Sequence, residues 1–504
     1  MDTSSAESVD HLRQRIDDEI NSLQASIRAL KSHRNELAPI SRLPPETLAA
    51  IFSFLPSSRF AHVCSRWRET TLNYPRLWSY INFDMLTPVG MDEILTRAMT
   101  PLHLEANVTQ MSNEQFDAFK KQLNTHISRT RHLHICGALR STLEGLPSPA
   151  PVLESLSLSQ FATPEPIVPF DVFNGTTPSL TSLELVGCNI SWRSPLLKGL
   201  RTLKIELAGP FPEARPYLQD WLDALDQMSQ LETLVLRCAS PSAPQVAPLI
   251  SKPLRIVTIS SLTKFHIDAS AKDCVLALAH LILPALTWLH VEAKSYEPEG
   301  EDVRLLIPYI ARNVYMLQGI EQLRHILIGD CECAEVRAWT TSHDENVYCT
   351  TAPENLIFTA RGSYYWHPGV DIAILDALLT LLPMNSVLTL TAPNITGLSK
   401  EFWLSQAPRW PMLEWASLSF TRIKAFSDML AEEAPPDGPR LPSLTKLTLD
   451  YFGSHVPMVY DLRDMLIERV EQGVPLEVLE LRPCLVDDHA IRLFAEVVVD
   501  VQAL

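Results

Sequence analysis

The chain has 504 residues, and its 42 basic and 59 acidic side chains leave a formal net charge of −17, which argues against a nucleic-acid-binding surface. Glycine is scarce at 16 residues while proline is plentiful at 38, and this imbalance argues against an enzyme built on glycine-rich phosphate loops. With 46% hydrophobic residues the chain can bury a large core, so disorder throughout is excluded, and the length predicts several domains or one repetitive architecture.

The N-terminus and the cysteines indicate the cellular compartment. Residues 1–10 are polar and acidic, so no secretory signal is expected. No uncharged apolar run approaches the roughly 18 residues that span a bilayer, and no membrane partner is expected. The nine cysteines are odd in number and scattered without paired zinc-ribbon spacing, which favours reduced thiols and a cytoplasmic or nuclear location.

Residues 9–37 carry a heptad pattern within the first predicted domain, an amphipathic or coiled-coil helix over residues 1–38. The apolar residues that define one helix face are Ile16, Ile20, Leu23, Ile27, Leu30 and Leu37. Arg34 interrupts one expected apolar position. Two interpretations remain open: self-association through residues 9–37, or a helix that folds back onto its own chain.

Residues 39–82 form the second predicted domain, which contains two short helices. The first begins at Leu43-Pro44-Pro45-Glu46, where proline suits the first turn. Its apolar face is expected to hold Leu48, Ile51, Phe52 and Leu55. The second is expected to place Phe60, Val63, Cys64 and Trp67 on one face, before Pro75-Arg76-Leu77-Trp78 ends the unit. Two such wide apolar faces in so short a unit indicate a partner surface.

The order and helical phase of these blocks resemble an F-box, and the heptad helix upstream is typical of fungal F-box proteins. The resemblance implies docking on the Skp-type adaptor of a cullin-based ubiquitin ligase. The residues that it implies for the adaptor groove or the F-box core are Leu43, Pro44, Leu48, Ile51, Phe52, Val63, Cys64 and Trp67. The stretch from Leu55 to Val63 is about one helical turn shorter than in a usual F-box, which predicts a truncated second helix.

Residues 83–504 form the third predicted domain and repeat a Leu-x-x-Leu-x-Leu pattern. The middle residues of nine clean copies are Leu156, Leu183, Leu203, Leu234, Val257, Leu289, Ile326, Leu447 and Leu479. Such a recurrence is typical of a leucine-rich repeat, in which each copy supplies one parallel strand and a return helix or loop. Return helices are expected at residues 216–228, 303–317, 371–382 and 459–472. Residues 335–368 break the period, either as a strand-rich insertion or as a degenerate repeat.

The predicted fold class is therefore an α/β solenoid. An irregular leucine-rich-repeat array follows a small all-α F-box and an N-terminal heptad helix. Cys188, Cys331 and Cys484 occupy the same position after the last leucine of three copies, and structural rather than redox roles are expected for them.

Signatures of catalysis are absent from the sequence, so neither an enzyme nor a cofactor is expected. There is no glycine-rich phosphate loop, no His-Glu-x-x-His and no Gly-x-Ser-x-Gly. The best metal candidate is His132-x-His134-x-Cys136, whose alternate residues share one face of a strand. The repeat pattern explains the same alternation, because Leu133 and Ile135 would point into the core, and no metal site is expected.

The residues that alternate with the buried leucines would form the surface that binds a partner. Among them Arg237, Trp288, Trp415 and Arg482 are of the types that dominate protein interfaces, and they are the predicted substrate-binding residues. The preferred function is the substrate-recognition subunit of a Skp/cullin/F-box ubiquitin ligase, with an unknown protein substrate and catalysis by proximity alone. The alternative, which the shortened second helix motivates, is a non-ligase F-box scaffold or assembly protein.

Overall fold

The structure of the chain is a computed structural model. It describes residues 3–503 except 56–57, 100, 147, 162–164, 210–214, 244–252, 254, 298, 318–322, 330–333, 341–354, 363–367, 394–397, 420–422, 433–434, 437, 451–455 and 483–487. The chain forms two compact units, Met1–Leu156 with Thr176–Ser179 and Ser157–Gly175 with Leu180–Leu504. No helix in the described part of the chain is long and apolar enough to cross a membrane.

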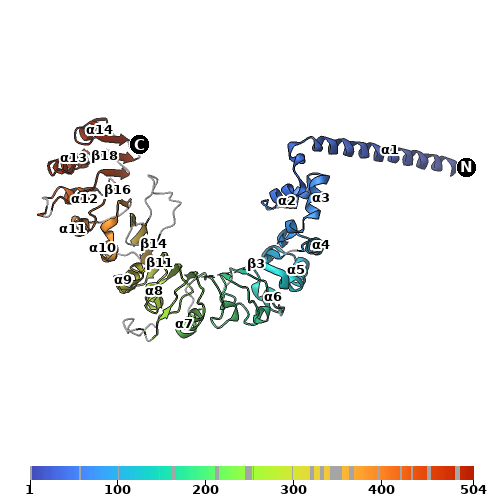
Figure 1. The fold of residues 1–504 in the computed structure, drawn as a ribbon, viewed down its shortest axis with the longest axis horizontal. Coiled ribbons are helices and arrows are strands. Elements are labelled where there is room, and N and C mark those ends of the chain that lie inside the picture. The colour runs from blue at the N-terminus through green and yellow to red at the C-terminus, as the bar shows by residue number, and fades with distance from the viewer. Residues whose placement is uncertain are drawn as a thin grey trace. The chain divides into compact units, whose positions relative to one another are not determined.

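The first unit begins with α1 (Thr3–Glu36), a single helix of 34 residues (Figure 1). It ends before Pro39, which opens the short helix η1 (Pro39–Arg42). The apolar face predicted from the heptad pattern is exposed along its whole length, from Val9 to Leu37. The helix therefore does not pack its apolar face against the described residues of the first unit.

The region predicted as two helices contains four helical segments after η1. They are α2 (Pro45–Phe52), η2 (Ser58–His62), α3 (Ser65–Asn73) and η3 (Pro75–Trp78). Cys64 has an extended backbone (φ −155°, ψ 168°) and precedes the first residue of α3. Phe60 and Trp67 therefore belong to different helices, and the prediction of one continuous second helix is wrong.

The remainder of the first unit is a small parallel sheet with helices. Its elements are β1 (Tyr80–Asn82), η4 (Phe83–Met85), α4 (Pro88–Arg97), β2 (Leu102–Asn107), η5 (Val108–Gln110), α5 (Asn113–His126), η6 (Ile127–Arg129), β3 (Thr130–Cys136) and α6 (Leu139–Leu143). β2 lies between β1 and β3, parallel to both, and Leu104 stands opposite Leu133. These leucines are buried. The strand–helix alternation thus begins before the first leucine-pattern copy.

The second unit is built on one large, mostly parallel sheet. In spatial order its strands are β5 (Ser182–Val186), β6 (Thr202–Glu206), β7 (Thr233–Arg237), β9 (Lys264–Ser270), β11 (Trp288–Ser295), β14 (Leu356–Gly362), β13 (Ala334–Trp339), β12 (His325–Gly329), β15 (Thr389–Ala392), β16 (Trp415–Ser419), β17 (Lys446–Asp450), β18 (Val478–Arg482) and β19 (Asp500–Ala503). β4 (Ser155–Ser159) carries the first leucine copy. The fold is thus of an α/β solenoid type.

Helices cover one face of this sheet (Figure 1). They are α7 (Leu218–Gln227), α8 (Ala271–Ala279), α9 (Glu301–Val314), α10 (Pro368–Leu381), α11 (Lys400–Gln406), α12 (Ile423–Leu430), α13 (Val456–Glu471) and α14 (Asp488–Ala495). Four of them, α7, α9, α10 and α13, confirm the predicted return helices. The leucines of the repeated pattern, such as Leu183, Leu203 and Leu479, are fully buried, because every second strand residue points to the same face.

The sheet departs from a regular array at two places, of which the second was one of the two predicted alternatives. The copy around Val257 forms β8 (Val257–Thr258), which pairs with β10 (Leu281–Ile282) outside the large sheet, and β9 takes the place beside β7. Residues 335–368 are not a degenerate repeat. The antiparallel strand β13 and its neighbour β14 stand between β11 and β12, so the insertion lies within the sheet.

Cys188 is a structural residue, as predicted. It is fully buried, and its thiol donates to the carbonyl of Leu158 over 3.4 Å. Burial raises the pKa of the Cys188 thiol to about 12, so the reactive thiolate is not formed at neutral pH. Cys331 and Cys484 lie outside the described residues.

Four arginines share one structural role, which is to donate to carbonyl oxygens at the end of a preceding helix or turn. The acceptors are Leu95 and Ala98 for Arg129, Leu278 and Leu281 for Arg312, Leu379 and Leu382 for Arg409, and Arg440, Leu441 and Leu444 for Arg469. Arg469 is buried, which lowers the pKa of its guanidinium to about 10. The arginines therefore add charged donors to carbonyls near the ends of helices and turns, where few intrahelical donors remain.

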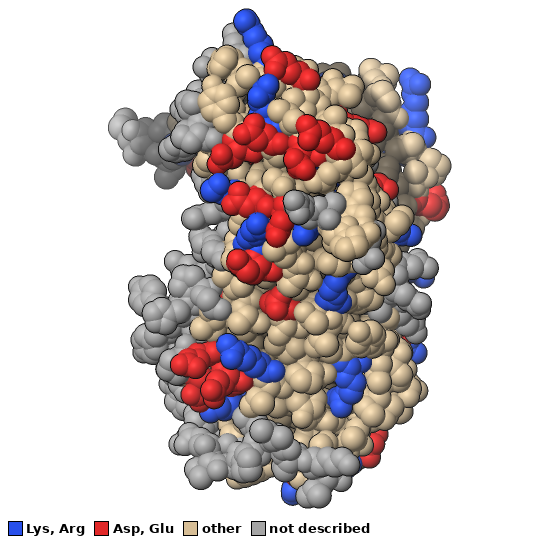
Figure 2. All heavy atoms as spheres, turned by 90° about the vertical axis from the view of Figure 1, so that its left-hand side faces the viewer, with Lys and Arg blue, Asp and Glu red and all other residues tan. Residues whose placement is uncertain are grey.

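Acidic side chains gather over the upper part of the face shown in Figure 2, which is the side of the second unit where its C-terminal helices lie. Asp461 and Asp464 of α13 are exposed, and Asp428 of α12 is half-buried. Lys424 pairs with Asp428 at 3.3 Å and with Asp461 at 3.2 Å. Part of the net negative charge is therefore concentrated on this helical surface.

Candidate functional site

The predicted F-box residues divide between a small core and an exposed surface. The core contains Leu48, Phe52 and Phe60, with Leu43, Trp67 and Leu77 packed against it. The Phe52 ring stacks on that of Phe60, with ring centroids 4.6 Å apart, and lies 4.9 Å from that of Trp67. Aromatic packing of this kind holds α2, η2 and α3 together.

Hydrogen bonds fix the ends of α3 relative to the segments around it. The Arg66 guanidinium donates to the carbonyl of Leu43 over 2.6 Å, which joins α3 to the residues that precede α2. At the other end, the Trp78 indole donates to the carbonyl of Thr71 over 2.9 Å. Trp78 is buried, so its N–H needs this partner, and the aromatic anchor predicted from the sequence closes the unit.

The other predicted F-box residues face solvent. Pro44 and Val63 are exposed, Cys64 is half-buried, and Ile51 keeps 39% of its surface exposed. Two neighbours of Ile51 that were not among the predicted site residues are also exposed, Phe54 at 87% and Leu55 at 49%. We call Ile51, Phe54 and Leu55 the α2 apolar patch. Their i, i+3, i+4 spacing across the turn that ends α2 places them side by side.

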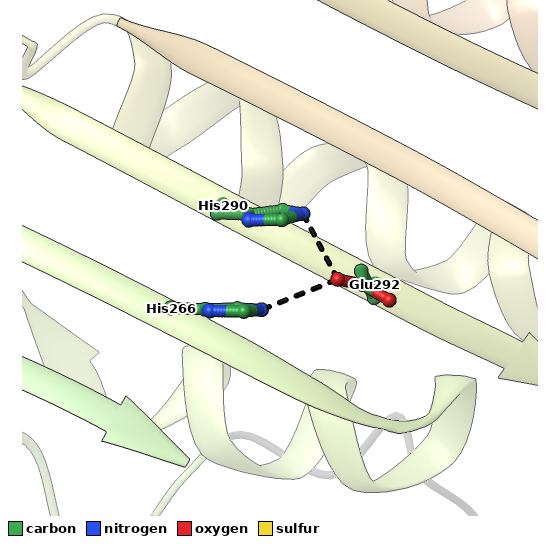
Figure 3. Close-up of side chains that lie close together, drawn as sticks. All are labelled: His266, His290 and Glu292. Carbon is green, nitrogen blue, oxygen red and sulfur yellow. Dashed lines mark ion pairs between the residues drawn. The ribbon is translucent and has the colours of Figure 1, made fainter. Parts of the chain in front are cut away.

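A second candidate region lies on the face of the large sheet that the helices do not cover. We call Arg237, His266, Trp288, His290 and Glu292 the histidine cluster, and Figure 3 shows His266, His290 and Glu292 of this cluster. His266 of β9 stands opposite His290 of β11, and their rings stack 4.0 Å apart at an angle of 8°. Trp288 and Glu292 flank His290 at alternate positions of β11, because the intervening Leu289 and Val291 point into the core.

Glu292 connects the members of the histidine cluster. Its Oε1 atom lies 3.4 Å from His266 Nε2, 3.2 Å from His290 Nε2 and 3.9 Å from Arg237 Nη2. The imidazoles of His266 and His290 hold the pKa of the Glu292 carboxyl well below its usual range. Burial lowers the pKa of His266. At neutral pH the cluster therefore contains an ionised carboxylate beside a neutral, buried imidazole.

A third group on the same sheet face is a buried ionic network. We call Trp415, Lys446, Thr448, Glu480 and Arg482 the Glu480 cluster. Glu480 is 2% exposed, and its carboxylate lies 2.6 Å from both Lys446 Nζ and Arg482 Nη2. Thr448 donates to the same carboxylate over 3.0 Å and accepts from the Trp415 indole over 2.8 Å.

The structure brings the four predicted substrate-binding residues together in pairs. Arg237 and Trp288 belong to the histidine cluster, whereas Trp415 and Arg482 belong to the Glu480 cluster. Trp415 is 9% exposed, and Lys446 lies 4.7 Å above its ring, so this tryptophan is less accessible than predicted.

Sequence reasoning missed His266 as a site residue. A signal was available in Leu262-x-x-Phe265-x-Ile267, which is the repeated pattern with phenylalanine and isoleucine in place of two leucines. The ring of His132 lies against that of His103, with centroids 4.2 Å apart and an angle of 31° between the planes. Within the described residues, His132, His134 and Cys136 do not form a group with convergent ligand atoms.

The helical unit that contains α2, η2, α3 and η3 matches a known family of domains. The F-box-like family matches residues 40–84, and an F-box-like domain therefore occupies this part of the chain. No curated protein matches the chain.

Among solved structures, the chain is similar to a chain in the crystal structure of the Rad7 and Elc1 complex in yeast. The identity is 14%, over 88% of this chain and 92% of the other, with a TM-score of 0.26. A likeness at this score is too weak to support an inference about fold or function.

Proposed function

We propose that the chain is the substrate-recognition subunit of a Skp/cullin/F-box-type ubiquitin ligase that acts in the cytoplasm or nucleus. The observation that carries this proposal is the F-box-like domain at residues 40–84. The domain would bind a Skp-type adaptor and, through it, a cullin. The chain would supply no catalytic residue, because holding a substrate close to the transferring subunits is enough to accelerate the reaction.

The adaptor would contact the exposed part of the F-box-like domain. Pro44, Val63 and the α2 apolar patch offer apolar surface that no described residue covers. Leu48, Phe52, Phe60 and Trp67 would act indirectly, by holding α2 and α3 in position. Clustered exposed apolar side chains on a folded unit favour a protein partner.

The second unit would be an irregular leucine-rich-repeat array that binds the substrate. Buried leucines on parallel strands at the repeated pattern support this assignment. The open face of its sheet presents the histidine cluster, in which Arg237 and Trp288 are of the types that contribute most to protein interfaces. A protein substrate with both polar and apolar contacts would suit this face.

An alternative is a non-ligase F-box scaffold. The break between η2 and α3 at Cys64 favours it, because a cullin would need the adaptor to be held in one fixed orientation.

To test the proposal, the purified full chain is mixed with a Skp-type adaptor and a cullin, and the complexes are separated by gel filtration. We expect all three proteins to elute together. Recovery of the adaptor without the cullin would favour the scaffold, and failure to bind the adaptor would contradict both functions.

The exposed face of α1 would mediate self-association. In heptad terms Ile20 and Ile27 occupy a positions, and Leu23 and Leu30 occupy d positions, a combination that favours parallel two-stranded coiled coils. We expect light scattering to give twice the monomer mass of 56.6 kDa for the full chain and the monomer mass after residues 1–38 are removed. Monomer mass for both proteins would contradict self-association, and an Ile20→Asp, Ile27→Asp variant tests the same face without truncation.

A further inference from the structure

His266, His290 and Glu292 bring three potential metal-ligand atoms together on the open face of the sheet. These atoms, two imidazole nitrogens and one carboxylate oxygen, all lie within 4.8 Å of one another (Figure 3). In the part of the chain that the structure describes, no other three His, Cys, Asp or Glu side chains converge in this way. The residues come from neighbouring strands of a continuous sheet, which fixes their backbones relative to one another.

The distances suit a tetrahedral ion. Zinc binds nitrogen and oxygen ligands at about 2.0–2.1 Å, so neighbouring ligand atoms of a tetrahedral site are about 3.3 Å apart. The Glu292 Oε1 atom lies 3.4 Å from His266 Nε2 and 3.2 Å from His290 Nε2, close to that value. The two rings are nearly parallel, so their planes would tilt toward each other to share one ion.

His266 has an unsatisfied nitrogen that points to the same conclusion. The residue is 5% exposed, and no described atom is placed to make a hydrogen bond with its Nε2. The contact with Glu292 is close, but its geometry is not that of a hydrogen bond. A buried polar atom without a partner is costly, and coordination of a cation would remove that cost.

The surrounding charges favour a dication. Besides Glu292, the neighbouring carboxylates are Glu206, 3.9 Å from Arg237, and Asp268, 2.6 Å from Lys294. Three carboxylates and two cationic side chains leave a net charge of −1 when both imidazoles are neutral.

We propose that His266, His290 and Glu292 form a binding site for a transition-metal dication such as Zn²⁺. Three protein ligands leave one coordination position, which water or a side chain of a bound partner would fill. The two imidazoles select against Mg²⁺ and Ca²⁺, which prefer oxygen ligands. This site differs from the sequence-based expectation of no metal, and it does not depend on the proposed role of the F-box-like domain.

The test is a calorimetric titration of the chelator-treated full chain with ZnCl₂. We expect one site that is absent with MgCl₂, and a visible absorption spectrum typical of tetrahedral coordination when Co²⁺ replaces Zn²⁺. Loss of a supporting neighbour of a metal ligand lowers metal affinity by about 10- to 100-fold, so loss of a ligand itself, in His290→Ala or Glu292→Gln, should lower it by at least about 100-fold.

The control variant is His134→Ala, which removes a histidine of the other strand candidate and should leave the affinity unchanged. Glu292→Gln keeps the shape of the side chain, so it remains informative if His290→Ala reduces the melting temperature. Absence of Zn²⁺ binding, or binding that neither His290→Ala nor Glu292→Gln weakens, would overturn the site. The latter result would assign the metal to other histidines or cysteines of the chain.

Discussion

Replacement of Ile51 by glutamate should abolish capture of a Skp-type adaptor by a chain that remains folded. Ile51 lies in the α2 apolar patch with 39% of its surface exposed, so a glutamate there meets water in the free chain. In the complex, the carboxylate would be buried against apolar adaptor surface without a partner, which costs several kcal/mol. A cost of about 2.8 kcal/mol corresponds to a 100-fold loss of affinity, and titration calorimetry with the purified adaptor would measure it.

Two further variants make this result interpretable. Val89→Glu places the same charge at another exposed apolar residue, on α4 and outside the F-box-like match, and should leave adaptor affinity unchanged. Leu48→Ala removes a fully buried side chain and should lower the free energy of unfolding by about 2–5 kcal/mol. If Ile51→Glu binds the adaptor as tightly as the native chain, the α2 apolar patch is not the docking surface.

Replacement of Glu480 by glutamine should lower the free energy of unfolding of the second unit by about 3–5 kcal/mol. The substitution preserves shape but removes the negative charge between Lys446 and Arg482, each 2.6 Å from the carboxylate. It also weakens the acceptor for Thr448, which is fully buried. The measurement is urea-induced unfolding of the full chain, followed by circular dichroism.

The matched control is Glu184→Gln, which breaks an ion pair on the same sheet face. Glu184 lies 3.6 Å from Lys204, and both side chains are 39% exposed. Pairs that are solvated to this extent contribute about 0–1 kcal/mol, so the midpoint of unfolding should change little. Equal effects of the two substitutions would show that burial does not strengthen the Glu480 network.

The positions of the strands along the chain were largely predictable from the sequence, whereas the order in which the strands pair in the sheet was not. Alternating leucines determine which face of a strand is buried, and this local pattern located β5, β6, β7, β17 and β18. Which strands pair depends on interactions between distant segments. The antiparallel insertion of β13 separates β11 from β12, and no local pattern predicts that β11 would stand beside β14.

The sequence predicted only some of the residues that meet at each candidate site, because the others are brought there by contacts between distant segments. The sequence singled out Arg237 and Trp288, but their proximity depends on β9 standing between β7 and β11. In the F-box-like domain the helical spacing grouped Ile51 with Phe52, yet packing buries Phe52 and leaves Ile51 exposed. Spacing identifies residues on one side of a helix, and only the packing of the second helix decides which of them remain accessible.

The arginines that donate to carbonyls of a preceding helix or turn determine how the array can change in length. Arg312 donates to carbonyls at the end of α8, and Arg409 to carbonyls at the end of α10, so the acceptor and the donor belong to successive strand–helix layers. Deletion of one layer would remove these hydrogen bonds from the layer before it, at about 1.5–3 kcal/mol for each bond to a charged donor. Insertions between layers would separate the same partners, whereas insertions in the sheet, such as that of β13, leave them intact. Evolutionary change in this chain should therefore be easier within layers than by gain or loss of whole layers.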